Sequence, residues 1–300
     1  MISGFLSLYF ASILHSIPQV KVETQNQGAT QFQNILSVAP VPEAKATSDQ
    51  KNIPPPKIQA NAYVVMDLRS GKMLGQKSIG ERRSIGSITK LITALIVLDE
   101  NNLNDIVTVP DSATKIEGSK IWLASGEKIT VRDLLSGLLI HSGNDAAYTL
   151  AIFNAGSVDK FVGKMNEKAK KLGLNNTHFG NPAGLDHSDN YSTAEDIALL
   201  GSYAYRNSFI RYTVGISKTT VSSVNGKFKH ELENTNILLV KDPRFKGLKT
   251  GHTLEAGYSF VGVATLPNNN ASLLTVILDS PDRFKESIAL VDWAASNFNW

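Results

Sequence analysis

A serine and a lysine three positions apart are the residues of this 300-residue chain best placed to do chemistry. Ser87 and Lys90 lie in the stretch RSIGSITK of residues 83–90, and on a helix this spacing puts both on one face. A serine hydroxyl is a weak nucleophile, and a lysine whose pKa is lowered by burial can take its proton. Free backbone N–H groups at a helix start would also favour negative charge at Ser87. We therefore expect an activated serine with a lysine partner.

The spacing alone does not identify this pair, because it also occurs at Ser48/Lys51, Ser112/Lys115, Ser125/Lys128 and Ser157/Lys160. The surrounding sequence distinguishes Ser87 and Lys90 from the other four pairs. Those four pairs lie in polar or turn-like stretches, or, at Ser157, at the expected N-cap of an amphipathic helix whose lysine faces solvent. Ser87 instead opens a long apolar segment in which leucines recur at helical spacing. The sequence therefore favours Ser87.

A second polar cluster, Ser142-Gly143-Asn144, lies between two apolar helical segments. On a tight turn between helices, the hydroxyl and the amide would both face a cleft. Capping of the second helix explains the same residues, and taken alone it is the simpler interpretation. The Ser-x-Asn pattern is also not specific, because residues 188–190 and 223–225 repeat it.

The third cluster is Lys249-Thr250-Gly251-His252. A glycine at a strand edge lets a ligand approach without a side chain intervening. Lys249 would then present a positive charge, and Thr250 a hydroxyl, to an anionic group. Taken alone, Lys-Thr-Gly is a turn about as often as a site, but it occurs once in this chain.

The elements that must position these clusters follow an α/β (α+β) order. Buried-strand patterns occur near both ends of the folded part, and helical patterns fill the middle. We expect strands at 62–66, 257–264 and 272–278, helices at 130–140, 144–155, 158–172 and 197–205, a hairpin around Asn225-Gly226 and a last helix ending near Phe298. The pattern predicts an antiparallel sheet assembled from both chain ends, flanked by helices, with a helical insert.

Composition excludes several classes of function. A hydrophobic content of 42% supports a sizeable core, and a net charge of +3 without basic stripes argues against nucleic-acid binding. The chain has no cysteine, which excludes disulfides and thiolate metal sites. Its six histidines show no metal-binding spacing, so we expect neither a metal nor a cofactor.

Three segments are expected along the chain. Residues 1–18 are mostly apolar and resemble an export signal or a short anchor, residues 19–58 form a polar, proline-rich disordered linker, and residues 59–300 form the catalytic domain. This order predicts an exported protein whose folded domain is held near a membrane or released from it.

Taken in order, the three clusters match the trio of motifs shared by penicillin-binding proteins and class A β-lactamases. From about Ala60 onward the sequence resembles the D-alanyl-D-alanine carboxypeptidase family, the serine-type low-molecular-mass penicillin-binding proteins. Longer segments carry this resemblance: 139–146, 181–186, 191–196 and 247–253. They also favour Ser142 over Ser188, because Ser188 falls beside a different segment of the pattern.

The resemblance implies a β-lactamase/transpeptidase-like fold and acyl transfer on peptidoglycan stem peptides that end in D-Ala-D-Ala. Ser87 would attack the carbonyl of the penultimate D-Ala, Lys90 would take its proton, and Ser142 would relay a proton to the leaving amine. The backbone N–H groups of Ser87 and His252 would form the oxyanion hole. The implied substrate-binding residues are Asn144, Lys249, Thr250, Gly251 and His252. β-Lactams would acylate Ser87 as covalent inhibitors.

Three alternatives remain open from the sequence. A D,D-endopeptidase that cuts peptidoglycan cross-links would use the same residues. A class A β-lactamase would need a general base, for which Glu195 is the candidate, and a binding module without activity could keep the fold. The family's second, β-rich domain and its C-terminal amphipathic helix have no counterpart before Trp300, which leaves the N-terminal segment as the expected anchor.

Overall fold

The computed structural model describes residues 45–46, 53–266 and 271–300. The expected export segment, residues 1–18, and most of the expected linker, residues 19–58, lie outside these ranges.

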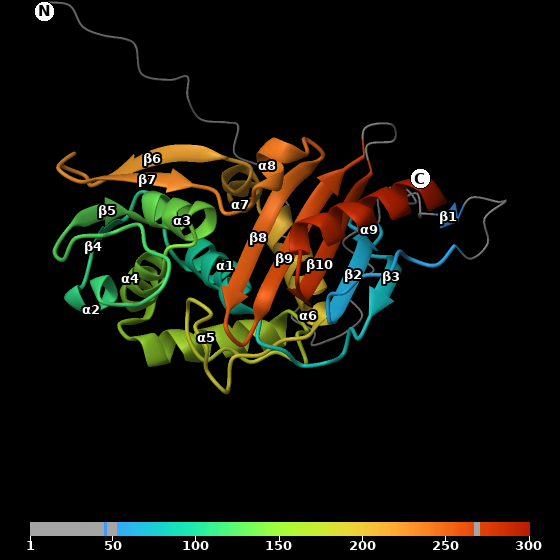
Figure 1. Cartoon of the computed structure of the whole chain (residues 1–300). Helices are drawn as coiled ribbons and strands as arrows, with labels where there is room; N and C mark the ends of the chain where they lie inside the picture. The colour runs from blue at the N-terminus through green and yellow to red at the C-terminus, as the bar shows by residue number, and fades with distance from the viewer. Residues whose placement is uncertain (1–44, 47–52, 267–270) are drawn as a thin grey trace, which may run out of the picture. The chain divides into compact units, whose positions relative to one another are not determined.

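A five-stranded antiparallel sheet is the centre of the fold, with strand order β3-β2-β10-β9-β8. Its strands are β2 (Ala62–Asp67), β3 (Met73–Lys77), β8 (Phe245–Thr253), β9 (Gly257–Thr265) and β10 (Ser272–Ser280). The pairing of β2 with β10, in which Val64 lies opposite Val276, joins the two ends of the chain (Figure 1). The prediction of a sheet from both chain ends is therefore confirmed.

Side chains alternate between two cores along these strands, as the two-residue period of a strand requires. On β2, Tyr63 and Val65 pack in a core with the last helix, whereas Val64 and Met66 pack in the larger core among the inserted helices. Both faces are covered, so the central strands are mostly apolar and do not alternate between apolar and polar residues.

Helices make up most of the rest of the described fold (Figure 1). They are η1 (Gly86–Thr89), α1 (Lys90–Glu100), α2 (Asp111–Thr114), α3 (Val131–Ile140), α4 (Asn144–Ala155), α5 (Val158–Lys171), α6 (Ala194–Arg206), α7 (Ser208–Val214), α8 (Leu238–Lys241) and α9 (Arg283–Asn297). The predicted helices are confirmed to within a few residues. Ser112, expected in a turn, lies in the short helix α2 instead, so that interpretation was wrong.

Side-chain caps determine where several helices begin. The side chain of Thr130 accepts a hydrogen bond from the Asp133 amide at the start of α3, and Ser157 caps α5 in the same way.

Three two-stranded sheets complete the described elements: β4 (Ile106–Thr108) with β5 (Lys128–Thr130), β6 (Lys218–Ser222) with β7 (Lys229–Glu233), and β1 (Lys45–Ala46) with β11 (Phe298–Asn299). The predicted hairpin around residues 225–226 joins β6 to β7.

One buried carboxylate ties the first strand to the last helix. Glu286 on α9 accepts hydrogen bonds from the backbone N–H groups of Gln59 and Ala60 and from the hydroxyl of Ser280. It thereby fixes the chain where it enters β2. Within the described residues, no helix is both long enough and apolar enough to cross a membrane.

Candidate active site

The predicted nucleophile lies at a junction of two helix types. Ser87 is in the 3-10 helix η1, and Lys90 is the first residue of α1 with none of its surface exposed. The Lys90 Nζ atom lies 2.8 Å from Ser87 Oγ, 2.7 Å from Asn144 Oδ1 and 2.8 Å from the carbonyl oxygen of Ala183. The predicted serine–lysine pair is thus in hydrogen-bond contact, and an amide holds the lysine in place.

The surroundings of Lys90 favour its neutral amine. Burial lowers its pKa well below the usual value, the charge of Lys249 lowers it further, and Asp145 partly offsets both. A neutral amine has two N–H donors and one lone pair. These match two oxygens that only accept, those of Asn144 and Ala183, and one serine hydroxyl that can donate. The geometry therefore allows Lys90 to accept the proton of Ser87.

Ser142 and Asn144 form the opposite wall, on the turn between α3 and α4. Ser142 has a positive φ of 64° and accepts a hydrogen bond of 2.9 Å from Lys249 Nζ. Asn144 donates from Nδ2 to the carbonyl oxygen of Glu117 at 2.6 Å, so its Oδ1 faces Lys90. The N-cap of α4 is Gly143, without a side-chain cap. The simpler interpretation of this cluster as a helix cap was therefore wrong.

The third cluster lies within strand β8. Lys249 is buried, and desolvation, assisted by the charge of Arg283, lowers its pKa to about 7. The Thr250 Oγ1 atom lies 2.6 Å from Thr235 Oγ1. Lys249 and Thr250 thus place a cation and a hydroxyl beside the wall made by Ser142.

Gly251 explains how closely β8 approaches the nucleophile. A Cβ atom at Gly251 would lie 2.5 Å from the Ile85 carbonyl oxygen, and one at Gly86 would lie 3.0 Å from the backbone nitrogen of His252. Glycine at both positions therefore brings the backbone N–H of His252 next to the Ser87 segment. The side chain of His252 is exposed and stacks on Tyr258, with ring centroids 4.2 Å apart.

Arg283 is a residue of this region that the sequence analysis missed. Its Nη1 atom donates to the carbonyl oxygens of Gly251 at 2.7 Å and Ser259 at 3.3 Å, and burial lowers the pKa of its guanidinium. A signal was present, because Arg283 is the first residue of α9, where the helix dipole disfavours a cation. The region therefore holds a second cation whose charge acts on Lys249.

The Ala183 carbonyl was also missed, because a backbone atom has no motif of its own. The Oδ1 atom of Asn181 accepts hydrogen bonds from the N–H groups of Ala183, Gly184 and Leu185. This turn orients the Ala183 carbonyl toward Lys90. The Asn-Pro-x-Gly signal at residues 181–184 predicts a turn, but the turn's role at the site depends on the fold.

The structure brings the three clusters together and separates them from the rival residues. Glu195 is exposed in the first turn of α6, and among the described residues no hydrogen bond joins it to Ser87 or Lys90. The Ser223 hydroxyl bonds to Asn225 within the β6–β7 turn, as expected for a hairpin residue. Residues 45–46, 53–266 and 271–300 also contain no cluster of three side chains suited to a metal ion.

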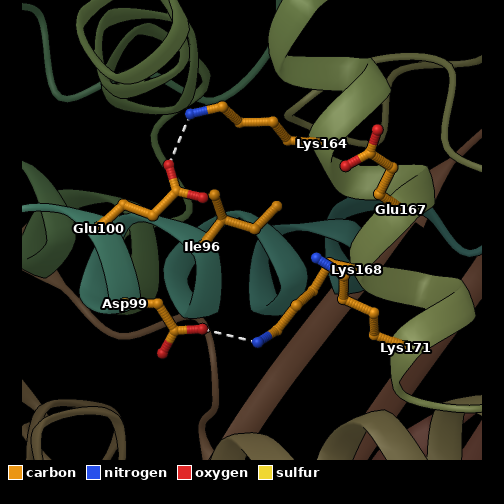
Figure 2. A pocket seen from close by; sticks show the side chains of 7 residues that line it. All are labelled: Ile96, Asp99, Glu100, Lys164, Glu167, Lys168 and Lys171. Carbon is orange, nitrogen blue, oxygen red and sulfur yellow. Dashed lines mark hydrogen bonds and ion pairs between the residues drawn. The ribbon is translucent and has the colours of Figure 1, made fainter. Parts of the chain in front are cut away.

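A separate hollow lies between α1 and α5 (Figure 2). Lys164 pairs with Glu100 at 2.5 Å, and Lys168 pairs with Asp99 at 2.6 Å. The lining residues are Ile96, Asp99, Glu100, Lys164, Glu167, Lys168 and Lys171. Acidic and basic side chains balance, and none of them belongs to the serine–lysine cluster. This hollow therefore does not compete with that cluster as the candidate site.

Comparison with known proteins gives one consistent result. The sequence model of the D-alanyl-D-alanine carboxypeptidases, the S11 peptidases, matches residues 48–282. The chain is 34% identical to carboxypeptidase DacF of Bacillus subtilis over 88% of its own length and 69% of the relative's. It is 35% identical to carboxypeptidase DacC of Escherichia coli over 83% of its own length and 64% of the relative's. It thus spans about two thirds of these relatives.

The fold agrees with this result. The crystal structure of the Streptomyces K15 DD-transpeptidase superposes with a TM-score of 0.77 at 34% identity, covering 81% of this chain and 100% of that one. This is the β-lactamase/transpeptidase fold expected from the sequence. By its sequence, its sheet and its helical insert, the chain belongs to the serine-type D-alanyl-D-alanine carboxypeptidase family.

Proposed function

We propose that the protein is a serine D-alanyl-D-alanine carboxypeptidase that removes the terminal D-Ala of peptidoglycan stem peptides. The observation that carries the proposal is the 2.8 Å contact between Ser87 Oγ and the Nζ atom of a buried Lys90 whose pKa is well below its usual value. Such a pair supplies both the nucleophile and its base.

The reaction runs through an acyl-enzyme. Lys90 takes the hydroxyl proton as Ser87 Oγ bonds to the carbonyl carbon of the penultimate D-Ala, and the N–H groups of Ser87 and His252 stabilise the oxyanion. Ser142, bonded to Lys249, relays a proton to the leaving amine, and the amide C–N bond breaks. Water then hydrolyses the ester and restores the serine hydroxyl.

Binding of the substrate rests on complementary charge. Lys249 and Thr250 bind the terminal carboxylate, and Arg283 adds a second cation nearby. Gly251 lets β8 lie close to the Ser87 segment. Asn144 holds Lys90 and binds the amide of the acyl-peptide. The substrate location implies an exported protein of the cell envelope, with the N-terminal segment as its membrane contact.

The proposal is tested by brief exposure of the full-length chain to benzylpenicillin followed by mass spectrometry. We expect one covalent adduct in the parent protein and none in Ser87→Ala. Hydrolysis of a D-Ala-D-Ala peptide by the parent protein alone would then establish the carboxypeptidase. Folded parent protein that forms no adduct would contradict the mechanism, and rapid turnover of the penicillin would favour a β-lactamase.

The pH dependence of activity follows from the two lysines. Lys249 is cationic below its pKa of about 7 and neutral above it, so kcat/KM for an anionic peptide should fall as the pH rises through about 7. Lys90 must be neutral to act as base, and burial lowers its pKa well below the usual value, so activity should also fall as the pH drops through that lowered pKa. In Lys249→Arg the cation persists at high pH. We expect this variant to lose the alkaline limb, and an alkaline limb that stays in place would exclude Lys249 as its origin.

A further inference from the structure

The loop of residues 117–123, between α2 and β5, has an unusual backbone conformation. Trp122 in this loop has a positive φ of 64°, which is strained for a bulky residue, and 78% of its surface is exposed. Burial of the indole ring therefore does not stabilise the conformation. A strained backbone persists only where the surrounding structure fixes it. Contacts of the neighbouring residues must therefore hold the 117–123 loop in this form.

The inner side of this loop holds Asn144. The carbonyl oxygen of Glu117 accepts a hydrogen bond of 2.6 Å from Asn144 Nδ2, and that of Ser119 accepts one of 2.7 Å from the Asn144 N–H. A Cβ atom at Gly118 would lie 2.7 Å from Asn144 Nδ2, so the loop also packs directly on this amide. Because Lys90 Nζ lies 2.7 Å from Asn144 Oδ1, the position of the loop determines where the amine of Lys90 is held.

The next residue, Asp145, holds the strained part of the loop. Its Oδ1 atom accepts a hydrogen bond of 3.1 Å from the Ile121 N–H, and its Oδ2 atom accepts one of 3.1 Å from the Leu123 N–H. The two bonds lie on either side of Trp122, where the backbone turns both N–H groups toward one carboxylate. Asp145 is buried, and its charge partly offsets the lowering of the Lys90 pKa. A shift of the loop would therefore change the surroundings of Lys90 as well as its position.

A buried histidine fixes the other side of the loop. The Nδ1 atom of His230 on β7 lies 2.8 Å from the Ile121 carbonyl oxygen, and the side chain is almost fully buried. Its Nε2 atom lies 2.8 Å from Oε1 of Glu127, whose Oε2 accepts a hydrogen bond of 2.9 Å from the Ala124 N–H. A carbonyl oxygen only accepts, so Nδ1 carries a proton, and a second proton lies between Nε2 and Oε1. The pair thus joins the loop to the β6–β7 hairpin through buried hydrogen bonds.

We propose that His230 and Glu127 are positioning residues for Lys90. They hold the 117–123 loop in its strained form, and the loop in turn holds Asn144 against the lysine amine. Both residues lie outside the three motifs, and they act through the loop rather than on the substrate. The inference rests on the proposed function, in which Lys90 is the base.

The test measures the second-order rate constant for acylation of the full-length chain by benzylpenicillin across pH. His230→Phe keeps a ring but removes both hydrogen bonds of the imidazole, and we expect acylation to fall about 10- to 100-fold, as for a small misplacement of a catalytic group. The charges of Lys249 and Asp145, which also act on the Lys90 pKa, remain in the variant. Water admitted beside Lys90 would relieve its desolvation, the largest cause of the lowered pKa, so the acidic limb should move to higher pH.

Two further variants separate positioning from stability. Glu127→Gln should keep the parent rate and acidic limb, because an amide can donate to a neutral imidazole and accept from the Ala124 N–H. Val221→Ala is the matched control for packing, because Val221 is buried directly opposite His230 in the hairpin. A thermal melt measures the stability of each variant. If His230→Phe does not fold, His230→Phe/Glu127→Gln takes its place, because it buries no uncompensated charge.

The results distinguish positioning from a purely structural role. A folded His230→Phe protein with the parent rate would overturn the proposal, as would a slower protein whose acidic limb had not moved. An equal fall in Val221→Ala, or a rate in Glu127→Gln as low as that in His230→Phe, would also contradict it. A parent protein that forms no adduct with benzylpenicillin would instead contradict the proposed function itself.

Discussion

Replacing Lys90 by methionine should slow acylation of Ser87 by about 10²–10⁴-fold, the usual contribution of a general base. Methionine keeps a long unbranched side chain, so the buried space remains filled. It has no lone pair on nitrogen, so the serine proton has no acceptor at 2.8 Å. The measurement is the second-order rate constant for acylation by benzylpenicillin.

Lys160→Met is the matched control, because Ser157 and Lys160 repeat the same spacing with an exposed lysine. We expect it to acylate at the parent rate. A thermal melt of each variant would show that both are folded. A folded Lys90→Met protein that acylated at the parent rate would exclude Lys90 as the base.

Replacing Gly184 by alanine should cost about 3–5 kcal/mol of unfolding free energy, in the range of the most damaging single substitutions. The new Cβ would lie 1.9 Å from the Gly86 carbonyl oxygen, and Gly184 has a positive φ of 81°. Relief of this clash must move either the turn that orients the Ala183 carbonyl or the segment that carries Ser87. Acylation should therefore fall together with stability, which urea denaturation and penicillin binding would measure.

The control variant Gly156→Ala separates the cost of the positive φ from the cost of the clash. Gly156 ends α4 with φ at 79°, and a Cβ there meets no atom within 4 Å. Gly156→Ala should then lose only about 1–2 kcal/mol of unfolding free energy, the cost of the left-handed backbone conformation for a residue other than glycine. If Gly184→Ala were no more destabilising than Gly156→Ala, the close approach of the 181–184 turn to the nucleophile segment would be refuted.

The fold was predictable where side-chain periodicity is strong. The buried strands at both ends are short apolar runs, and the amphipathic helices between them repeat at a period of 3.6 residues. A sheet that joins distant segments covers the apolar faces of both. The nine-residue length of β8 was not predicted, because two glycines and two lysines interrupt its pattern. The strand forms because packing of β8 against apolar neighbours outweighs the low strand propensity of these residues.

The contacts at Lys90 show the limit of sequence reasoning at the site. Ser87 and Asn144 were found because each stands in a motif with side-chain chemistry. The third partner, the Ala183 carbonyl, is a backbone atom whose role depends on a turn that packs against Gly86. Arg283 lies 30 or more residues from every motif, and only its unfavourable place at a helix start distinguished it.

Because the sheet needs both ends of the chain, it also determines when the enzyme can form. Strand β2 gains its second neighbour only after residues 272–280 have been synthesised, which at ribosomal speed is about 10–40 s after β2 itself. Until then, β8, the strand that carries Lys249, is not held in place beside Ser87 and Lys90. The hydrolytic site therefore cannot be complete before residues 272–280 have been synthesised.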